Sequence, residues 1–149
     1  MHRILVLHGP NLNALGTREP DTYGRVTLAE IDRGLERLSG QLGCEVECLQ
    51  SNHEGVLIDA LYGARDRSHG VLLNPGGLTH GSVVLRDAIL AVGLPVVEVH
   101  VSNPHRREPF RHVSAVSGAA LGVVQGFGAD SYFLALRALA GHLERSRNA

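Results

Sequence analysis

Apolar segments of strand length alternate with stretches of helical periodicity along the whole chain, and this alternation restricts the fold more than any other feature. The strands are predicted at Arg3–His8, Glu45–Cys48, Val71–Asn74, Pro95–His100 and Ala119–Val124, with helices from about Leu28, Ser51, Ser82 and Asp130. Such alternation is typical of a parallel sheet with right-handed crossovers and helices on both faces. The second strand alternates polar and apolar residues as an edge strand does, which favours the order 2-1-3-4-5. We therefore predict a single flavodoxin-like, doubly wound α/β domain over residues 1–149.

Local signals indicate where two of the helices begin. Thr27 and Glu30 have capping-box spacing before an apolar series, and Ser51 and Glu54 have the same spacing. We expect a helix to begin at each pair and Gly43 to end the first helix. We expect the last residues, 146–149, to be frayed.

Two connections are longer than ordinary loops of this fold, which have about 2–6 residues. Residues 9–26 separate the first strand from its helix, and residues 101–118 separate the fourth strand from the fifth. Both fall at the carboxyl edge of the sheet, where ligands bind in this topology. We expect residues 9–26 to form a lid over a functional site.

Three neighbouring strands end in polar residues at that edge. These ends are His8–Asn13, Asn74–His80 and Glu98–Asn103. One polar strand end is unremarkable, but three adjacent ones that contain Asn, His and Glu indicate a site.

Composition excludes several functional classes. Hydrophobic residues make up 44% of the chain and charged residues 19%, which is typical of a globular protein, and the net charge of −1 gives no footprint for nucleic acid. The sequence contains no run of membrane-spanning length and no signal-peptide pattern, so we expect a cytoplasmic protein without membrane contact. Cys44 and Cys48 lie too far apart on one strand to bridge, and we expect reduced thiols.

All basic residues are arginines. Without lysine the chain cannot form an imine through a lysine side chain, hold a nucleotide with a P-loop lysine or anchor pyridoxal phosphate. The 9 histidines show no helix-spaced or cysteine-paired zinc spacing, so we expect no metal.

Two residue pairs are candidates for acid–base chemistry. Glu98 and His100 are two apart on a strand and share a face, so the carboxylate can fix the imidazole tautomer and favour the protonated form of a general acid. Arg18 precedes Tyr23 in the long loop, and a guanidinium near a phenol stabilises the phenolate, which can act as a base. A surface Glu–His pair and a packing tyrosine have the same spacings, so both alternatives stay open.

Taken together, these segments resemble the type II 3-dehydroquinate dehydratases. The matching segments are 9–13, 16–24, 50–55, 74–80 with 85–88, 98–103 and 107–111, which occur in the family's order and span nearly the whole chain. His8, Leu78 and Gly118 depart from residues that are common in the family, and none of these departures removes a catalytic group.

The resemblance implies dehydration of 3-dehydroquinate to 3-dehydroshikimate by anti elimination through an enolate, without cofactor or metal. In that case Tyr23 is the base, Arg18 stabilises its phenolate, and Asn11 holds a water on the enolate oxygen. His100, oriented by Glu98, protonates the departing hydroxyl. The implied substrate contacts are Asn74, His80, Val101, Ser102 and Arg111, and Asp87 would reach a neighbouring subunit's site.

The family also implies a homo-oligomer, a dodecamer built from trimers. The reaction is the third step of chorismate biosynthesis in the shikimate pathway, and quinate breakdown uses the same reaction, so this choice stays open. A flavin- or phosphate-binding module is the other alternative, although Pro10 removes an amide donor from the loop that would hold a phosphate.

Overall fold

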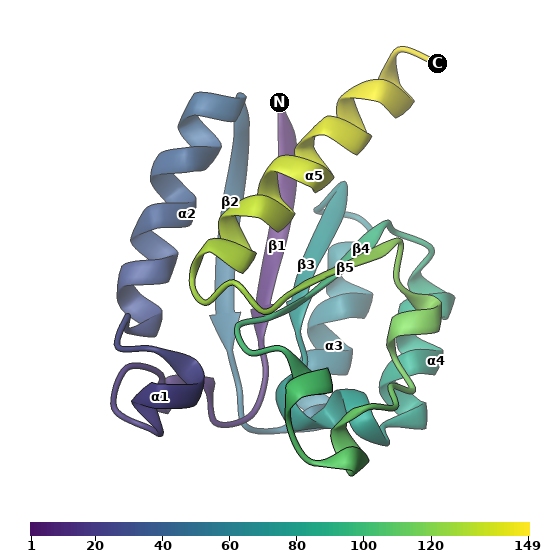
Figure 1. The fold of residues 1–149 in the computed structure, drawn as a ribbon. Coiled ribbons are helices and arrows are strands. Elements are labelled where there is room, and N and C mark those ends of the chain that lie inside the picture. The colour runs from purple at the N-terminus through teal and green to yellow at the C-terminus, as the bar shows by residue number, and fades with distance from the viewer.

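The computed structural model describes residues 1–149 and contains one sheet of five parallel strands between two layers of helices (Figure 1). The strands are β1 (His2–His8), β2 (Cys44–Gln50), β3 (Gly70–Asn74), β4 (Val96–His100) and β5 (Gly122–Gln125). Their order in the sheet is β2-β1-β3-β4-β5. The predicted flavodoxin-like order is therefore confirmed.

Four long helices cover the sheet, two on each face (Figure 1). Helices α2 (Leu28–Leu42) and α5 (Asp130–Arg147) pack together on one face, and α3 (Glu54–Ala64) and α4 (Val83–Val92) pack together on the other. The short helix α1 (Pro20–Tyr23) lies in the long β1–α2 connection, at the carboxyl edge. Several short 3₁₀ turns lie in the β4–β5 connection at the same edge.

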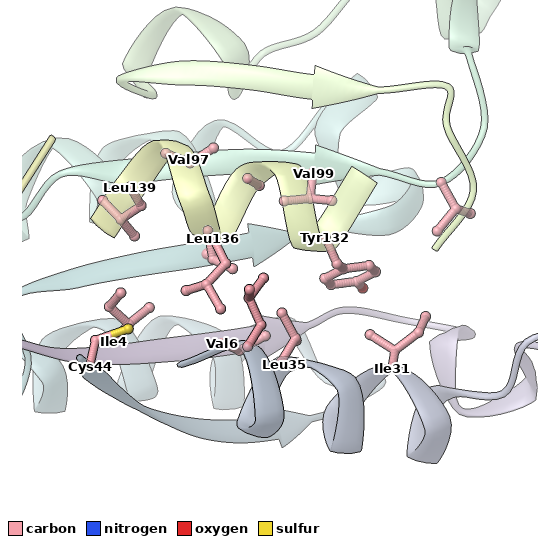
Figure 2. Close-up of a cluster of buried hydrophobic side chains, with 14 of the residues drawn as sticks. Ile4, Val6, Ile31, Leu35, Cys44, Val97, Val99, Tyr132, Leu136 and Leu139 are labelled. Atoms are coloured by element: carbon pink, nitrogen blue, oxygen red, sulfur yellow. The ribbon is translucent and has the colours of Figure 1, made fainter. Parts of the chain in front are cut away.

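The strands direct alternate side chains into two separate cores. Ile4 and Val6 of β1 point into the core under α2 and α5, whereas Leu5 and Leu7 point into the core under α3 and α4. Figure 2 shows the first core, where Leu35 of α2 and Val6 of β1 lie toward the side chains of α5. Each fully buried aliphatic side chain contributes about 1.5–3 kcal/mol relative to exposure. Burial on both faces explains why the β1 sequence is continuously apolar.

The predicted start and end of α2 are confirmed. The Thr27 hydroxyl accepts a hydrogen bond from the Glu30 backbone N–H at 3.2 Å. Gly43 caps the other end with φ of 70°, a left-handed conformation that costs glycine little. Ile31, Leu35 and Leu38 lie buried along the inner face of this helix.

The predicted capping box at Ser51 and Glu54 is wrong. Helix α3 begins after His53, and the Ser51 hydroxyl accepts from the His53 N–H within a turn. The Glu54 carboxylate instead accepts a hydrogen bond from the Ser82 hydroxyl, at the start of α4. A contact with a neighbouring helix therefore replaces the local one that the spacing predicted.

One further boundary differs from the prediction. Strand β5 begins at Gly122, because Ser117–Ala119 form a 3₁₀ turn. Helix α5 continues to Arg147, so only Asn148 and Ala149 of the segment 146–149 lie beyond it, and the fraying of this segment stays a prediction. Arg145 and Arg147 lie in the last turn, where positive charge favours the carbonyl end of a helix.

Thr27→Ala should lower the free energy of unfolding by about 1 kcal/mol, because the Glu30 N–H loses its acceptor. Thr27→Ser keeps the hydroxyl and should restore most of the loss. Urea unfolding of the three proteins measures the difference. Equal stability of Thr27→Ala and Thr27→Ser would show that the cap contributes nothing.

Candidate active site

The polar strand ends converge at the carboxyl edge of the sheet. His8 and Asn74 are register partners where β1 pairs with β3, and His100 ends the neighbouring strand β4. Gly9 follows β1 directly and lies against the Pro75 backbone, where an added Cβ would stand 2.8 Å from the carbonyl carbon. The two loops therefore meet closely at this edge, as the strand ends predicted.

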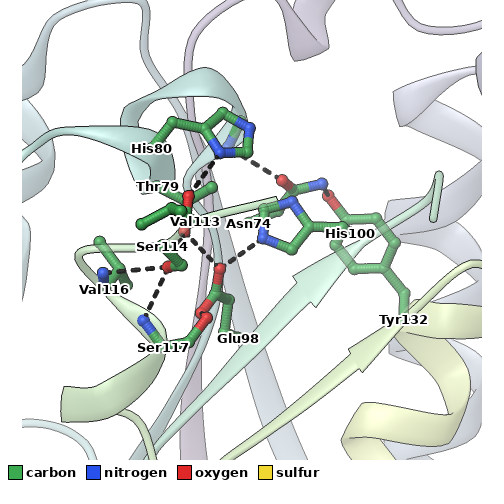
Figure 3. Close-up of polar contacts among 11 residues, drawn as sticks. Asn74, Thr79, His80, Glu98, His100, Val113, Ser114, Val116, Ser117 and Tyr132 are labelled. Carbon is green, nitrogen blue, oxygen red and sulfur yellow. Dashed lines mark hydrogen bonds and ion pairs between the residues drawn. The ribbon is translucent and has the colours of Figure 1, made fainter. Parts of the chain in front are cut away.

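Glu98 and His100 form a buried hydrogen-bonded pair (Figure 3). The His100 Nε2–H donates to Glu98 Oε2, which fixes the tautomer and turns Nδ1 away from the carboxylate. Thr79 donates to the same oxygen at 2.6 Å, and Ser117 donates to Oε1 at 2.6 Å. Three donors thus hold a carboxylate that is fully excluded from solvent.

These donors also set the charge of Glu98. Burial alone raises the pKa of a carboxyl group, but the hydrogen bonds from His100, Ser117 and Thr79 and the His100 charge outweigh burial and hold the pKa of Glu98 below its usual value. Glu98 is therefore ionised at neutral pH. The ionised carboxylate can compensate the positive charge that an imidazole carries when it acts as a general acid.

His80 is fixed by the loop that follows β4. Its Nδ1–H donates to the Val113 carbonyl at 3.0 Å, because a carbonyl can only accept. His80 and Arg111 line the same hollow as His100, with a volume of about 330 Å³. We call this hollow the His100 pocket.

Residues 21–24 of the β1–α2 connection line a second hollow. Tyr23 at the end of α1 lines it together with Val101, Ser102 and Arg107, with a volume of about 380 Å³. We call it the Tyr23 pocket. The segment 101–107 contributes residues to both hollows: Pro104 and His105 line the His100 pocket, and residues on either side of them line the Tyr23 pocket.

Two guanidinium groups flank the Tyr23 ring. The Cζ of Arg18 lies 4.7 Å from the ring centroid, and that of Arg107 lies 5.0 Å from it. Arg107 also donates to the Ser102 hydroxyl at 3.3 Å. The predicted Arg18–Tyr23 contact is thus present, and Arg107 adds a second positive charge that spacing did not reveal.

Asn11 and Asp87 lie apart from these two pockets. Asn11 is exposed in the β1–α2 connection with a left-handed φ of 71°, and its backbone N–H donates to the Asn52 side chain at 2.9 Å. Asp87 is exposed on α4 and lines neither pocket. Asn74 is buried beneath the edge, with its carboxamide held by Gly76 and Tyr132.

Sequence reasoning missed the residues that support Glu98 and His100, which we call the acid pair. Ser114 and Ser117 come from the β4–β5 connection, and the Ser114 hydroxyl lies 2.6 Å from that of Thr79. A serine in a long loop has no pattern that distinguishes it from other loop serines. Its place beside Glu98 depends on how the loop folds back over α4.

Three potential metal ligands also meet in this region. His8, Asp32 and Cys48 place their ligand atoms within 4.8 Å of one another. His8 Nε2 already lies 2.8 Å from Asp32 Oδ1. Burial and the neighbouring Asp32 carboxylate raise the pKa of the Cys48 thiol, which disfavours the thiolate that binds metals. The group is therefore a hydrogen-bonded cluster, and the absence of a metal stays a prediction.

The fold and the pockets define an α/β enzyme with an ordered Glu–His pair at the carboxyl edge of a doubly wound sheet. A family model described as "Dehydroquinase class II" matches residues 2–140. A 3-dehydroquinate dehydratase of Gloeobacter violaceus is 60% identical over 143 residues, which cover 96% of this chain and 89% of the relative. One of Xanthomonas campestris is 58% identical over 146 residues, covering 97% and 99%.

Solved structures agree with the sequence matches. The crystal structure of a type II dehydroquinase from Butyrivibrio crossotus has a TM-score of 0.91 and 39% identity, covering 93% of this chain and 97% of that one. The chain belongs to the class II dehydroquinase family. No helix combines the length and the apolar character needed to cross a bilayer.

Glu98→Gln should weaken the dependence of stability on pH in acid. The folded-state pKa of Glu98 lies below its unfolded value, so the stability that it contributes is complete above the unfolded value and is lost as the pH falls through the folded one. We expect the free energy of unfolding of the wild type to fall below about pH 4.5. The free energy of unfolding of Glu98→Gln should fall less over the same pH range, although this variant is less stable than the wild type at neutral pH.

Urea unfolding between neutral pH and pH 3 measures this difference. Glu45→Gln, which changes an exposed residue of β2, should keep the wild-type profile. Parallel profiles for Glu98→Gln and the wild type would contradict the lowered pKa.

Proposed function

We propose that this chain dehydrates 3-dehydroquinate to 3-dehydroshikimate by anti elimination through an enolate, a hydro-lyase reaction and the third step of chorismate biosynthesis. One observation carries the proposal. A phenol with two guanidinium groups over its ring and an imidazole ordered by a buried carboxylate line two pockets at the same sheet edge, and segment 101–107 contributes residues to both pockets. These are a base and an acid for the two proton transfers of the elimination.

Tyr23 acts as the base. An unperturbed phenol is ionised about one part in a thousand at pH 7, which costs about 4 kcal/mol. The guanidinium groups of Arg18 and Arg107 lie over the ring and place positive charge near the phenolate that forms when Tyr23 acts as the base. The phenolate removes the proton beside the substrate ketone, and the lid, residues 9–26, closes over the substrate as it does so.

Asn11 and His100 handle the charge that follows. Asn11 holds a water on the enolate oxygen, where negative charge develops. His100 gives its proton to the departing hydroxyl, which leaves as water while the carbon–carbon double bond forms. Glu98 keeps the imidazole oriented and compensates its positive charge.

The remaining predicted residues bind the substrate. Asn74, His80 and Arg111 contact its hydroxyl groups, and Ser102 with the Val101–Ser102 backbone contacts its carboxylate. Their positions support this assignment: His80 and Arg111 line the His100 pocket, and Val101 and Ser102 line the Tyr23 pocket.

Purified protein should convert 3-dehydroquinate to a conjugated enone that absorbs in the ultraviolet, without added cofactor or metal and in the presence of EDTA. Tyr23→Phe should lower kcat by orders of magnitude and leave KM nearly unchanged, because it removes the base and little of the binding surface. Continuous absorbance measurements give both constants. No turnover by the wild type would overturn the proposal, and a flavin spectrum in the purified protein would favour the binding module instead.

We further propose that the protein is a cytoplasmic homo-oligomer, a dodecamer built from trimers. The outer face of α4 carries exposed Val83, Val84 and Leu90 around Asp87. Exposed apolar side chains grouped on one helix face are typical of an interface, and Asp87 at its centre would then face a neighbouring subunit's site. The two free thiols, Cys44 and Cys48, fit a reducing compartment.

Light scattering should give the mass of twelve 15.9-kDa chains. Leu90→Glu places a charge on the α4 face and should give a smaller assembly with lower activity. Leu134→Glu, a change at an exposed leucine of α5, should leave both unchanged. A monomeric wild type with full activity would contradict the assembly and the role of Asp87.

A further inference from the structure

A chain of buried hydrogen bonds leads from the surface of α2 to the Asn74 carboxamide. Asp32 of α2 is partly exposed, and its Oδ1 lies 2.8 Å from His8 Nε2. His8 Nδ1 lies 2.8 Å from the Tyr132 hydroxyl, which in turn lies 2.9 Å from Asn74 Nδ2. His8 and Tyr132 are fully buried. The proposed catalytic steps use none of Asp32, His8 and Tyr132.

The fold brings these side chains together from four elements. His8 and Asn74 are register partners at the ends of β1 and β3, so their side chains leave the same face of the sheet. That face is the one covered by α2 and α5, because His8 and Asn74 continue the alternation of Val6 and Leu72. Tyr132 in the first turn of α5 covers both, as Figure 3 shows for Tyr132 and Asn74.

Only one assignment of donors and acceptors satisfies every hydrogen bond from Asp32 to Asn74. The Gly76 N–H donates to Asn74 Oδ1 at 3.1 Å, so Asn74 Nδ2 is the donor to the Tyr132 oxygen. The Tyr132 O–H then donates to an unprotonated His8 Nδ1, and His8 Nε2–H donates to Asp32. A proton on Nδ1 would leave the buried Tyr132 O–H without an acceptor, which is costly.

We propose that His8 and Asp32 are positioning residues that, through Tyr132, hold the Asn74 carboxamide in the orientation that binds the substrate. The inference rests on the proposed function of Asn74. One N–H of its amide is committed to Tyr132 and its oxygen to Gly76, which leaves the second N–H to donate to a substrate oxygen. Without these hydrogen bonds the Asn74 amide can rotate, and part of the binding free energy of the substrate is then used to order the amide.

NMR of the protein without substrate tests the chain independently of activity. At pH 7.5 the long-range proton–nitrogen spectrum should show His8 with its proton on Nε2 and a bare Nδ1. The second measurement is hydrogen exchange of the Asn74 side-chain amide, which should be slow in the wild type and faster by at least tenfold in Tyr132→Phe. A His8 proton on Nδ1, or unchanged amide exchange in Tyr132→Phe, would overturn the inference even if the enzyme is fully active.

Kinetics test the consequence for binding. His8→Leu should raise KM for 3-dehydroquinate roughly tenfold, because the loss of one hydrogen bond weakens binding by up to about that factor. It should change kcat less than about threefold, because the Asn74 hydrogen bond acts on substrate and transition state alike. His8→Asn keeps an acceptor near the Nδ1 position and should recover most of the KM. Ile4→Ala, a core change on the same strand, should lower Tm without raising KM.

A merely structural role gives a different result. In that case His8→Leu, His8→Asn and Ile4→Ala lower Tm and active fraction, and KM stays at the wild-type value in all three. That outcome overturns the inference.

Should His8→Leu fail to fold, Asp32→Ala decides. Asp32 is the partly exposed end of this series of hydrogen bonds, and removal of its carboxylate should raise KM roughly twofold to fivefold. The matched change at an exposed aspartate of α3, Asp59→Ala, should have no effect. An unchanged KM in Asp32→Ala contradicts the inference, whereas a wild type without dehydratase activity contradicts the proposed function alone.

Discussion

Burial of the central strands on both faces is the constraint on which the rest of this structure depends. Strands β1, β3 and β4 have helices above and below them, so their interior positions accept only apolar side chains unless every polar atom has a partner. Polar residues therefore gather where the strands end. Parallel pairing then places all these ends at one edge, which is how a sheet with an apolar interior produces a reactive rim.

The two faces of the sheet carry different functional residues at the carboxyl edge. Glu98 continues the face that packs against α3 and α4, and its carboxylate is held by Thr79, Ser117 and His100. Asn74 belongs to the opposite face and is held through Tyr132 and His8. The acid pair and the Asn74 amide are thus ordered by separate hydrogen-bond networks. A change in one network should leave the geometry of the other largely intact.

The sequence predicted the fold to within a few residues wherever the signal was local or repeated. The apolar runs, the edge character of β2 and the Thr27 cap were all correct, because each depends on neighbours in the chain. The Ser51–Glu54 capping box was wrong because Glu54 found a better partner in Ser82, on a helix that is distant in sequence. The 3₁₀ turn at Ser117–Ala119 likewise follows from Ser114 and Ser117 bonding at the acid pair.

The sequence by itself determined the order of the strands, the two long loops at one edge and the candidate residues Tyr23, His100 and Glu98. Periodicity and spacing are properties of the chain alone, and the resemblance to a family rests on residues in order. Only the tertiary structure decided that Arg107 joins Arg18 at Tyr23, and that His8 and Asp32 lead to Asn74. These contacts join elements that are far apart in the sequence, and hydrogen-bond geometry depends on their packing, which no local pattern encodes.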